Sequence, residues 1–415
     1  MKNYNIDVAI IGAGPAGLSA ALEAKRQGVK KVMILERDTH LGGILQQCIH
    51  DGFGIHRFKE RMSGGQYAQK FIDELVGADI EVKSDTMVLD VTNDKVIYAC
   101  NKEEGMIKIT CGAIVLAMGC RERTASQVLI HGYRPSGVLT AGLVQRYINM
   151  EGYLPGKEAV ILGSGDIGLI MARRMTLEGI KVKGVYEVMA SPGGLTRNIV
   201  QCLDDYDIPL HLSTTVTNIH GKERVKAVTV VKLDENRKPI EGTEEIITCD
   251  LLVLAVGLIP ENELSLKAGI EMDPKTKGPL VDDRFMTSVP GIFACGNVAV
   301  VFDLVDYVSQ SGEIAGKGAA DYLFGKLSLD LDYVKVTAGE NINFVVPQRI
   351  SKGEKGDKTT FFMRVKTPRD KATLEGSVGD HVVLSKRHSF VAPPEMISCQ
   401  LNIEEDSAVT INMRG

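Results

Sequence analysis

The chain has 415 residues, a formal net charge of −5, 44% hydrophobic residues and a mean hydropathy of +0.01. At roughly 150 residues per domain, this length predicts two or three globular domains. Acidic and basic residues are interspersed, which argues against nucleic acid as the main partner, and no apolar run approaches the ~20 residues that a membrane-spanning helix needs.

The N-terminus enters a strand-like segment directly, without the basic and apolar stretches of an export signal. The eight cysteines are scattered and form no CxxC pair, which disfavours a disulfide framework, a zinc cluster and an iron–sulfur cluster bound by this chain alone. We therefore expect a reduced cytoplasmic protein without a metal site.

A nucleotide-binding signature begins at Asp7–Ile11, an apolar run that predicts a buried strand. Three glycines at GxGxxG spacing then lead into a predicted helix, Leu18–Gln27; they are Gly12, Gly14 and Gly17. A second strand, Val32–Leu35, ends at Glu36, which is placed to accept a hydrogen bond from a ribose 2′-hydroxyl. The glycines permit a tight turn, the approach of a pyrophosphate and close packing of helix on strand, so the segment predicts a dinucleotide site.

The same signature occurs a second time, with Gly163, Gly165, Gly168 and Glu187 in the same arrangement. From 12 to 163 and from 36 to 187 the displacement is 151 residues. Each copy is followed downstream by an apolar strand that ends in glycine, at Gly119 and at Gly257. The repeat predicts two bound dinucleotides, and the obvious pair is a flavin and a nicotinamide.

These motifs resemble those of the pyridine nucleotide–disulfide oxidoreductase family, the flavoproteins with two dinucleotide-binding domains. Residues 12–17 match the family's FAD fingerprint, "LAMGCRERT" resembles its first closing motif, and "GIFACGN", Gly291–Asn297, resembles the segment that returns the chain to the flavin. Within the family, "GLIPENEL" and "VFDLVDYVSQSGE" look closest to the FAD subunits of opine, proline and cyanide-forming amine dehydrogenases, and to flavoproteins that accompany glycerol-3-phosphate dehydrogenases.

The repeat and the resemblance together predict an α/β fold with two Rossmann-like domains, the NAD domain being inserted into the FAD domain, plus a small all-β C-terminal domain. The expected limits are 1–121 and 253–330 for the FAD-binding domain, 122–252 for the NAD-binding domain and 331–415 for the β-rich domain. Short alternating runs separated by Gly, Pro, Asp and Lys clusters indicate the β-rich domain, which we interpret as a packing or assembly module.

The resemblance also implies which residues bind the two cofactors. For FAD these are Gly12, Gly14, Pro15, Ala16, Gly17, Glu36, Arg37, Gly43, Gln47, Val88, Ala117, Met118, Gly119, Gly296, Asn297, Asp306 and Tyr307. For NAD(H) they are Gly163, Gly165, Asp166, Ile167, Gly168, Glu187 and Gly257. Asn297 stands where the family usually has an aspartate that binds the ribityl chain.

The candidates for catalysis are few, because hydride transfer between two stacked rings needs neither a nucleophile nor a metal. The cysteine pairs of the disulfide-reducing members are absent. Cys48 stands alone beside the expected isoalloxazine and is either a redox thiol or a small packed side chain. His50 is either a proton donor or flavin-wall residue, or a solvated loop histidine. Asp306 either tunes the flavin potential or caps a helix.

The second site favours NAD over NADP, because Glu187 would repel a 2′-phosphate and the first basic residue after it is Arg197. We expect an oxidoreductase that passes electrons between NAD(H) and a companion dehydrogenase or electron-transfer subunit, and we allow for a homo-oligomer. Two alternatives stay open: an FAD dehydrogenase subunit that works directly on a small amine or imino acid, and a non-catalytic assembly subunit that contains flavin.

Overall fold

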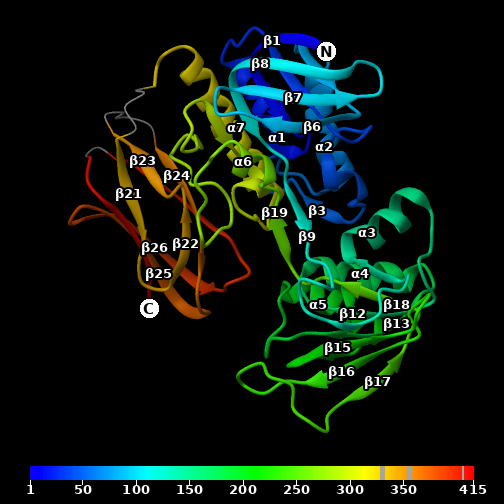
Figure 1. The fold of residues 1–415 in the computed structure, drawn as a ribbon. Helices are drawn as coiled ribbons and strands as arrows, with labels where there is room; N and C mark the ends of the chain where they lie inside the picture. The colour runs from blue at the N-terminus through cyan, green and yellow to red at the C-terminus, as the bar shows by residue number, and fades with distance from the viewer. Residues whose placement is uncertain (328–331, 353–357, 404–405) are drawn as a thin grey trace. The chain divides into compact units, whose positions relative to one another are not determined.

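The computed structural model describes residues 1–327, 332–352, 358–403 and 406–415, which form two compact units. One unit combines residues 1–120 with 260–415, and the other contains residues 121–259 (Figure 1). The segment expected to bind NAD, 122–252, lies within the second unit. The boundary expected at residue 331 lies outside the described residues, and the domain limits stay predictions.

The first Rossmann-like domain is built on a seven-stranded sheet in the order β5-β2-β1-β8-β7-β6, with β20 pairing with β8. Its strands are β1 (Lys2–Ile11), β2 (Val32–Leu35), β5 (Ile80–Lys83), β6 (Thr86–Val91), β7 (Val96–Asn101), β8 (Gly105–Leu116) and β20 (Ile292–Ala294). The pairs β5–β2, β2–β1, β1–β8 and β8–β20 are parallel. The pairs β8–β7 and β7–β6 are antiparallel. The parallel strands direct their carboxyl ends to one edge, where nucleotides bind in such sheets.

The helices of this domain connect and cover the sheet. They are α1 (Pro15–Arg26), η1 (Gly43–Gln47), α2 (Gly64–Leu75), α6 (Glu263–Lys267), η4 (Gly296–Val298) and α7 (Val305–Leu323), and a small hairpin is formed by β3 (Asp51–Phe53) and β4 (Met62–Ser63). The expected helix Leu18–Gln27 corresponds to α1, which begins earlier because Pro15 fits the first helical turn. The expected strand Asp7–Ile11 is the buried end of β1.

The second unit contains a five-stranded parallel sheet, β11-β18-β12-β13-β14, and a four-stranded sheet, β10-β15-β16-β17. Its strands are β10 (His131–Gly132), β11 (Val138–Thr140), β12 (Glu158–Leu162), β13 (Lys181–Tyr186), β14 (Leu210–His211), β15 (Thr214–His220), β16 (Ala227–Lys232), β17 (Glu245–Thr248) and β18 (Leu251–Leu254). Its helices are α3 (Ala141–Arg146), η2 (Tyr147–Glu151), α4 (Asp166–Leu177), α5 (Thr196–Cys202) and η3 (Asp204–Tyr206). The strands β9 (Cys120–Glu122) and β19 (Leu258–Pro260) form a separate two-stranded sheet.

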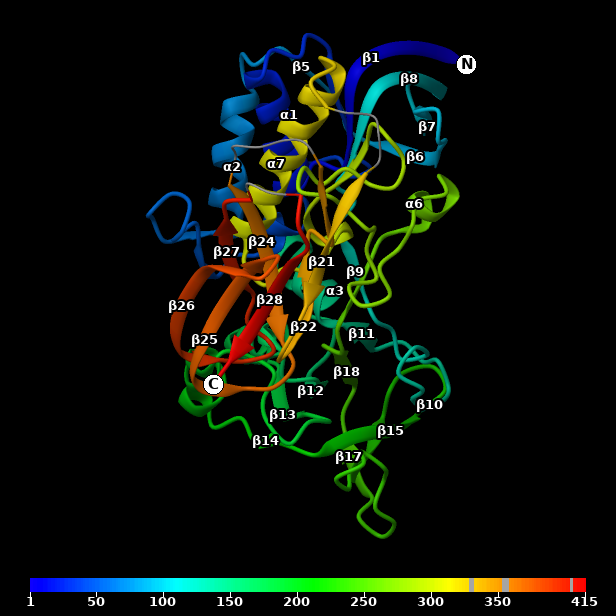
Figure 2. The same ribbon diagram turned by 90° about the vertical axis from the view of Figure 1, so that its left-hand side faces the viewer.

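Every described element after α7 is a strand (Figure 2). One sheet has the order β23-β21-β28-β25-β26 and the other the order β22-β24-β27. The strands are β21 (Tyr333–Ala338), β22 (Ile342–Val346), β23 (Arg349–Ser351), β24 (Thr359–Val365), β25 (Arg369–Val378), β26 (His381–Val391), β27 (Ile397–Leu401) and β28 (Val409–Arg414). They enclose a hydrophobic cluster of their own. The predicted fold class, two Rossmann-like domains plus a β-rich C-terminal region, is therefore confirmed.

Helices α1 and α7 are in contact along their length because small residues face each other. Gly312 and Gly316 lie one turn apart on α7, opposite the backbone of Ala16 and Ala20 on α1. A Cβ added at Gly316 would overlap the carbonyl oxygen of Ala20, so no larger side chain fits without moving a helix. This contact sets the distance between the helix that follows the first glycine turn and the helix that begins near Asp306.

We predict that Gly316→Ala lowers the free energy of unfolding by about 1–3 kcal/mol, the usual cost of overpacking a tight core contact. The matched control is Gly65→Ala on α2, where an added Cβ meets only the Gln46 side chain at 3.9 Å. That control should be neutral or slightly stabilising, because alanine is the better helix former. Denaturant titrations of both variants measure the difference, and equal stabilities would contradict the proposed role of the contact.

Candidate functional site

The first glycine turn has the geometry that a dinucleotide needs. Gly12 has φ +104°, and a Cβ there would overlap the carbonyl oxygen of Ala117, while a Cβ at Gly17 would overlap the carbonyl oxygen of Gly12. A Cβ at Gly14, in contrast, would meet nothing within 4 Å. Two glycines therefore allow the backbone to pack closely, and the third leaves open space at the start of α1, where free N–H groups can bind phosphate.

Glu36 directly follows β2 and is 7% exposed. Its Oε2 accepts a hydrogen bond from the Ala13 N–H at 2.7 Å, and its Oε1 accepts one from the Asp38 N–H at 2.8 Å. A carboxylate offers about four acceptor positions, so Glu36 retains two after satisfying these protein donors. The carboxylate thus joins the glycine turn to the end of β2 and still has capacity for ribose hydroxyls.

The second glycine turn reproduces the first. Gly163 has φ +103° and lies against Ala255 as Gly12 lies against Ala117, and a Cβ at Gly168 would overlap the carbonyl oxygen of Gly163. A Cβ at Gly165 would again meet nothing within 4 Å. In both copies, therefore, the second glycine has room for a Cβ, and the first and third glycines do not.

Glu187, 6% exposed, makes one more internal hydrogen bond than Glu36 does. Its Oε2 accepts from both the N–H and the hydroxyl of Ser164, at 2.8 and 2.6 Å, and its Oε1 accepts from the Met189 N–H at 2.9 Å. The Ser164 hydroxyl in turn accepts from the Gly193 N–H at 2.9 Å. One acceptor position of Glu187 remains, and the hydroxyl connects the loop after β13 to the glycine turn.

Sequence reasoning missed this Ser164 link, although the repeat contains the signal. Ser164 is displaced by 151 from Ala13, and the pair Gly193–Gly194 is displaced by 151 from Gly42–Gly43. In the first copy, a Cβ at Gly43 would lie 3.1 Å from the Gly14 Cα. Extending the alignment of the two copies past the glutamates would have shown both the shared glycine pair and the extra hydroxyl.

Most of the other residues predicted to bind FAD lie at the same edge of the first sheet as the glycine turn. Ala117 to Gly119 directly follow β8, and the Ala117 N–H donates to the Ile11 carbonyl at 2.9 Å. Thr86, two residues before the buried Val88, donates its N–H to the Glu36 carbonyl at 2.8 Å. Gln47 is buried within η1, and Arg37 is exposed directly after Glu36.

The segment with Gly296 and Asn297 returns to this edge through β20. Gly296 has φ +65° and donates its N–H to the Ser311 hydroxyl at 2.9 Å. The Asn297 side chain accepts from the Phe302 N–H at 3.0 Å and donates to the Cys120 Sγ at 3.5 Å. The amide therefore uses its donor as well as its acceptor, which an aspartate at this position could not do while ionised.

Cys48 and His50, the two catalytic candidates, follow η1. The Cys48 thiol is 9% exposed and donates to the Ile44 carbonyl at 3.4 Å, and burial raises its pKa to about 12. Its Cβ lies against the first residue of α2, Gly64. The His50 ring lies 5.1 Å from the Phe53 ring, measured between centroids. The raised pKa and the tight packing support the interpretation of Cys48 as a packed side chain.

Asp306 is the second residue of α7, whose N-cap is Leu304, so it is not the cap residue that one interpretation expected. Its Oδ2 accepts from the His56 N–H at 3.0 Å, while its Oδ1 is buried and has no hydrogen-bond partner among the described residues. The Tyr67 hydroxyl lies 2.8 Å from the Ser309 hydroxyl one turn further on, and burial raises the pKa of Tyr67. A buried carboxylate oxygen without a donor is the feature that a bound group would satisfy.

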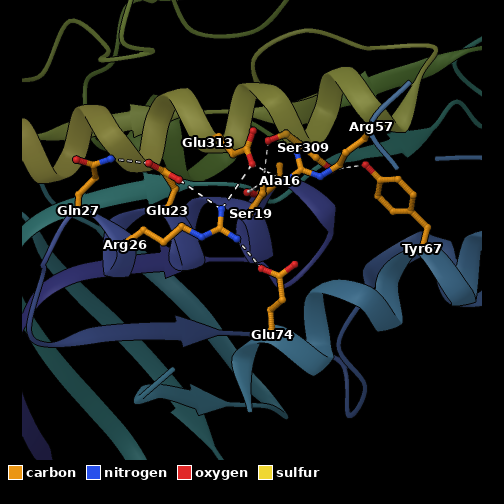
Figure 3. Close-up of polar contacts among 10 residues, drawn as sticks. All are labelled: Ala16, Ser19, Glu23, Arg26, Gln27, Arg57, Tyr67, Glu74, Ser309 and Glu313. Carbon is orange, nitrogen blue, oxygen red and sulfur yellow. Dashed lines mark hydrogen bonds and ion pairs between the residues drawn. The ribbon is translucent and has the colours of Figure 1, made fainter. Parts of the chain in front are cut away.

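Charged side chains form a network around Glu313, in the middle of α7 (Figure 3). Arg57 forms an ion pair with Glu313 at 2.5 Å, and the two side chains are 20% and 28% exposed. Arg26 on α1 forms an ion pair with Glu74 on α2 at 2.5 Å and lies 3.9 Å from Glu313. The network joins α1, α2 and α7 at Glu313, about two helical turns after Asp306. No sequence motif indicated it, because its members are brought together only by the tertiary fold.

Within the described ranges, no group of three His, Cys, Asp or Glu residues could hold a metal ion. No helix in the same ranges is long and apolar enough to cross a membrane. All eight cysteines fall in described segments and are free thiols.

Curated relatives of this chain include two oxidase or synthase subunits. Hydrogen cyanide synthase subunit HcnB of Pseudomonas protegens is 26% identical over 290 residues, 64% of this chain and 60% of the relative. An opine oxidase subunit of Agrobacterium tumefaciens is 24% identical over 335 residues, 76% of this chain and 64% of the relative. The chain thus spans less than two thirds of the length of these two relatives. The glutamate synthase (NADPH) small chain of Escherichia coli is 27% identical over 351 residues, 78% of this chain and 70% of the relative.

Solved structures with the same fold include two oxidoreductases. Thioredoxin reductase of T. acidophilum has a TM-score of 0.62 and 24% identity, and the match covers 76% of this chain and 98% of that one. L-proline dehydrogenase from P. horikoshii has a TM-score of 0.53 and 18% identity, with 78% of this chain and 56% of that one covered. These similarities confirm the two-domain Rossmann-like architecture.

The family model described as pyridine nucleotide-disulphide oxidoreductase matches residues 6–312, which include both glycine turns and the start of α7. The resemblance inferred from the glycine and closing motifs is therefore confirmed, and the chain belongs to the pyridine nucleotide-disulphide oxidoreductase family.

Proposed function

We propose that this chain is an FAD-dependent oxidoreductase that passes electrons between NAD(H) and a partner dehydrogenase or another acceptor, without a redox-active disulfide. The observation that carries the proposal is the duplication of one site. Each copy has an open glycine position at the start of a helix and a buried carboxylate at the end of the next strand. A chain that holds two dinucleotides can bring a nicotinamide and a flavin into reach of each other.

The residues of the first copy fit FAD. Gly14 leaves room for the pyrophosphate, Glu36 has two acceptor positions for ribose hydroxyls, and the unpartnered Oδ1 of Asp306 lies at the start of α7. FAD, when bound, supplies a ring system that takes up and releases electrons. In this proposal the chain binds and orients the cofactor, and Asp306 places a carboxylate near its ring.

The second copy would hold NAD(H), with NADH preferred. The one remaining acceptor position of Glu187 can take a hydrogen bond from the ribose 2′-hydroxyl, and its charge would repel a 2′-phosphate. No arginine or lysine follows it before Arg197. We also propose a cytoplasmic location and a companion subunit, because the eight cysteines are free thiols and relatives are described as subunits or a small chain.

A second candidate is an FAD dehydrogenase subunit that works directly on a small amine or imino acid. It is favoured by the similarity to hydrogen cyanide synthase subunit HcnB and to an opine oxidase subunit. In that case the second fold would be structural or would bind another nucleotide. Anaerobic mixing of the purified protein with NADH, NADPH or candidate amines separates the two functions: only the first predicts that NADH bleaches the flavin absorbance.

We predict that Gly14→Glu yields colourless protein, because the new carboxylate would occupy the pyrophosphate position and repel it. The matched control is Gly165→Glu, the same change in the second copy, where an added Cβ also meets nothing within 4 Å. The control should keep its full flavin content. The ratio of flavin to protein absorbance after purification is the measurement, and a yellow Gly14→Glu protein would show that the first copy is not the FAD site.

We predict that Glu187→Ala weakens NADH binding about 10- to 100-fold and reduces the difference between the affinities for NADH and NADPH. The reason is the loss of a hydrogen bond to a charged group, worth roughly 1.5–3 kcal/mol, and of the repulsion of a 2′-phosphate. The FAD content should not change. Rapid-mixing flavin reduction at several concentrations of each coenzyme gives both affinities.

The control for this variant is Ser164→Ala, which gives the second copy the alanine that the first copy has at position 13. It removes the link to Gly193 and keeps the carboxylate. We expect it to retain the preference for NADH. If Glu187→Ala leaves both concentration dependences unchanged, or if neither coenzyme reduces the wild type, the NADH assignment fails and the amine dehydrogenase becomes the better proposal.

We predict that Cys48 is inert in the folded protein, because a pKa raised to about 12 leaves only about one thiolate in ten thousand at pH 8. Native-state alkylation followed by peptide mass spectrometry should label the partly exposed Cys100 long before Cys48. The labelling rate of Cys48 should still rise above about pH 10, where an ordinary thiol with a pKa near 8.5 is almost fully ionised. Rapid labelling of Cys48 at pH 8 would restore the redox-thiol interpretation.

A further inference from the structure

A pocket of about 380 Å³ lies where the loop around Lys275 and the segment after Asn297 meet strands β22 and β24 of the β-rich region. Small-molecule sites have volumes of about 300–1,000 Å³, so this pocket has room for a small metabolite. None of the residues that line it is among those assigned to either nucleotide. It is therefore a separate feature of the larger unit.

The walls of the pocket are basic. Arg364 at the end of β24, Lys366 just beyond it and Lys275 on the opposite loop all line the cavity. Lys275 and Lys366 are exposed, whereas Arg364 is only partly accessible. Three cations around one concave space produce a positive potential there, because the low-dielectric walls focus the field.

Most hydrogen-bond donors of the Arg364 guanidinium have no acceptor among the described residues. A guanidinium carries five N–H donors, yet among the described residues only one bond is made, from Nη2 to the Val301 carbonyl at 3.2 Å. Its Nε is buried and has no partner in the described part of the chain. Burial lowers the pKa of Arg364, because removal from water disfavours the charged guanidinium. A buried cation with unused donors is stabilised by an anion.

Two acidic residues near the pocket do not cancel this charge. Asp303 interacts electrostatically with Arg364 and raises its pKa, but its Oδ2 accepts a hydrogen bond from the Met396 N–H at 2.8 Å. Asp273 accepts from the N–H groups of Lys275 and Thr276 and from the Gln348 amide. Asp303 interacts directly with Arg364 alone, so three positive charges face at most two negative ones and a net positive charge remains.

We propose that this pocket binds a small organic oxyanion, a carboxylate or a phosphate ester, through Arg364 with Lys275 and Lys366 at its rim. The other walls, which include Val300, Phe344 and Pro393, are apolar and would contact a short carbon chain on the ligand. Bidentate binding of planar or tetrahedral oxyanions is the contact that a guanidinium favours over an ammonium. The alternative interpretation, three solvated surface cations, leaves the unpaired Nε of Arg364 unexplained.

The test is isothermal titration calorimetry with inorganic phosphate and, separately, butyrate, at constant ionic strength. The protein carries Gly165→Glu, so that phosphate does not bind at the second glycine turn, and it is used with the flavin content it has after purification. We expect saturable binding of at least one probe, and the two arms show whether the site prefers phosphate or carboxylate. If neither phosphate nor butyrate binds saturably, the proposal is wrong.

The decisive variants remove the pocket cations one at a time. Arg364→Gln should weaken binding at least tenfold, and Lys275→Gln and Lys366→Gln several-fold each. Lys335→Gln, which removes an exposed charge on β21 outside the pocket, should leave the affinity unchanged. The two exposed lysine variants keep the test valid if Arg364→Gln fails to fold. If the Lys275→Gln and Lys366→Gln proteins bind the probe as tightly as the protein with the unaltered pocket and the Lys335→Gln protein do, the proposal is wrong.

Discussion

The hydrogen bonds that the two buried glutamates accept from the glycine turns are the constraint on which both turns depend. Glu36 accepts a hydrogen bond from the Ala13 N–H and Glu187 accepts one from the Ser164 N–H, each between the ends of two adjacent parallel strands, β1 and β2 or β12 and β13. Without the carboxylate, each turn would contain a buried unsatisfied N–H, which costs about 1–3 kcal/mol. Under the proposed function, the residue that selects the ribose also maintains the turn that receives the pyrophosphate, so binding and local structure cannot be varied independently.

The two copies differ in how much of this carboxylate is left for a ligand. Glu36 has two acceptor positions open, whereas Ser164 takes an additional one from Glu187 and connects it to Gly193. Under the proposed function, this difference matches the two cofactors. A flavin that stays bound benefits from more hydrogen bonds, and a coenzyme that must leave after each turnover is served by fewer.

The sequence was sufficient for the features that depend on local pattern. Glycine spacing, apolar strands and strand-ending glutamates predicted both Rossmann-like domains, and alternation of apolar residues predicted the β-rich region. It was not sufficient for features created by tertiary packing, such as the Arg57–Glu313 pair, whose members lie 256 positions apart. It also misplaced Asp306 as a possible cap, because capping depends on the backbone conformation of Leu304, which composition does not reveal.

The start of α7 shows why the β-rich region matters to a site it does not form. On one side Ser309 contacts Tyr67 of α2, and on another the ring of Phe362 in β24 lies 5.5 Å from Tyr307. Asp303, just before the helix, accepts a hydrogen bond from Met396 of the same β-rich region. The segment that carries Asp306, whose Oδ1 has no hydrogen-bond partner among the described residues, is thus held from both sides. This contact gives a reason for the packing role expected for residues 331–415. A rigid start of α7 would fix the direction of the Asp306 carboxylate relative to the first glycine turn.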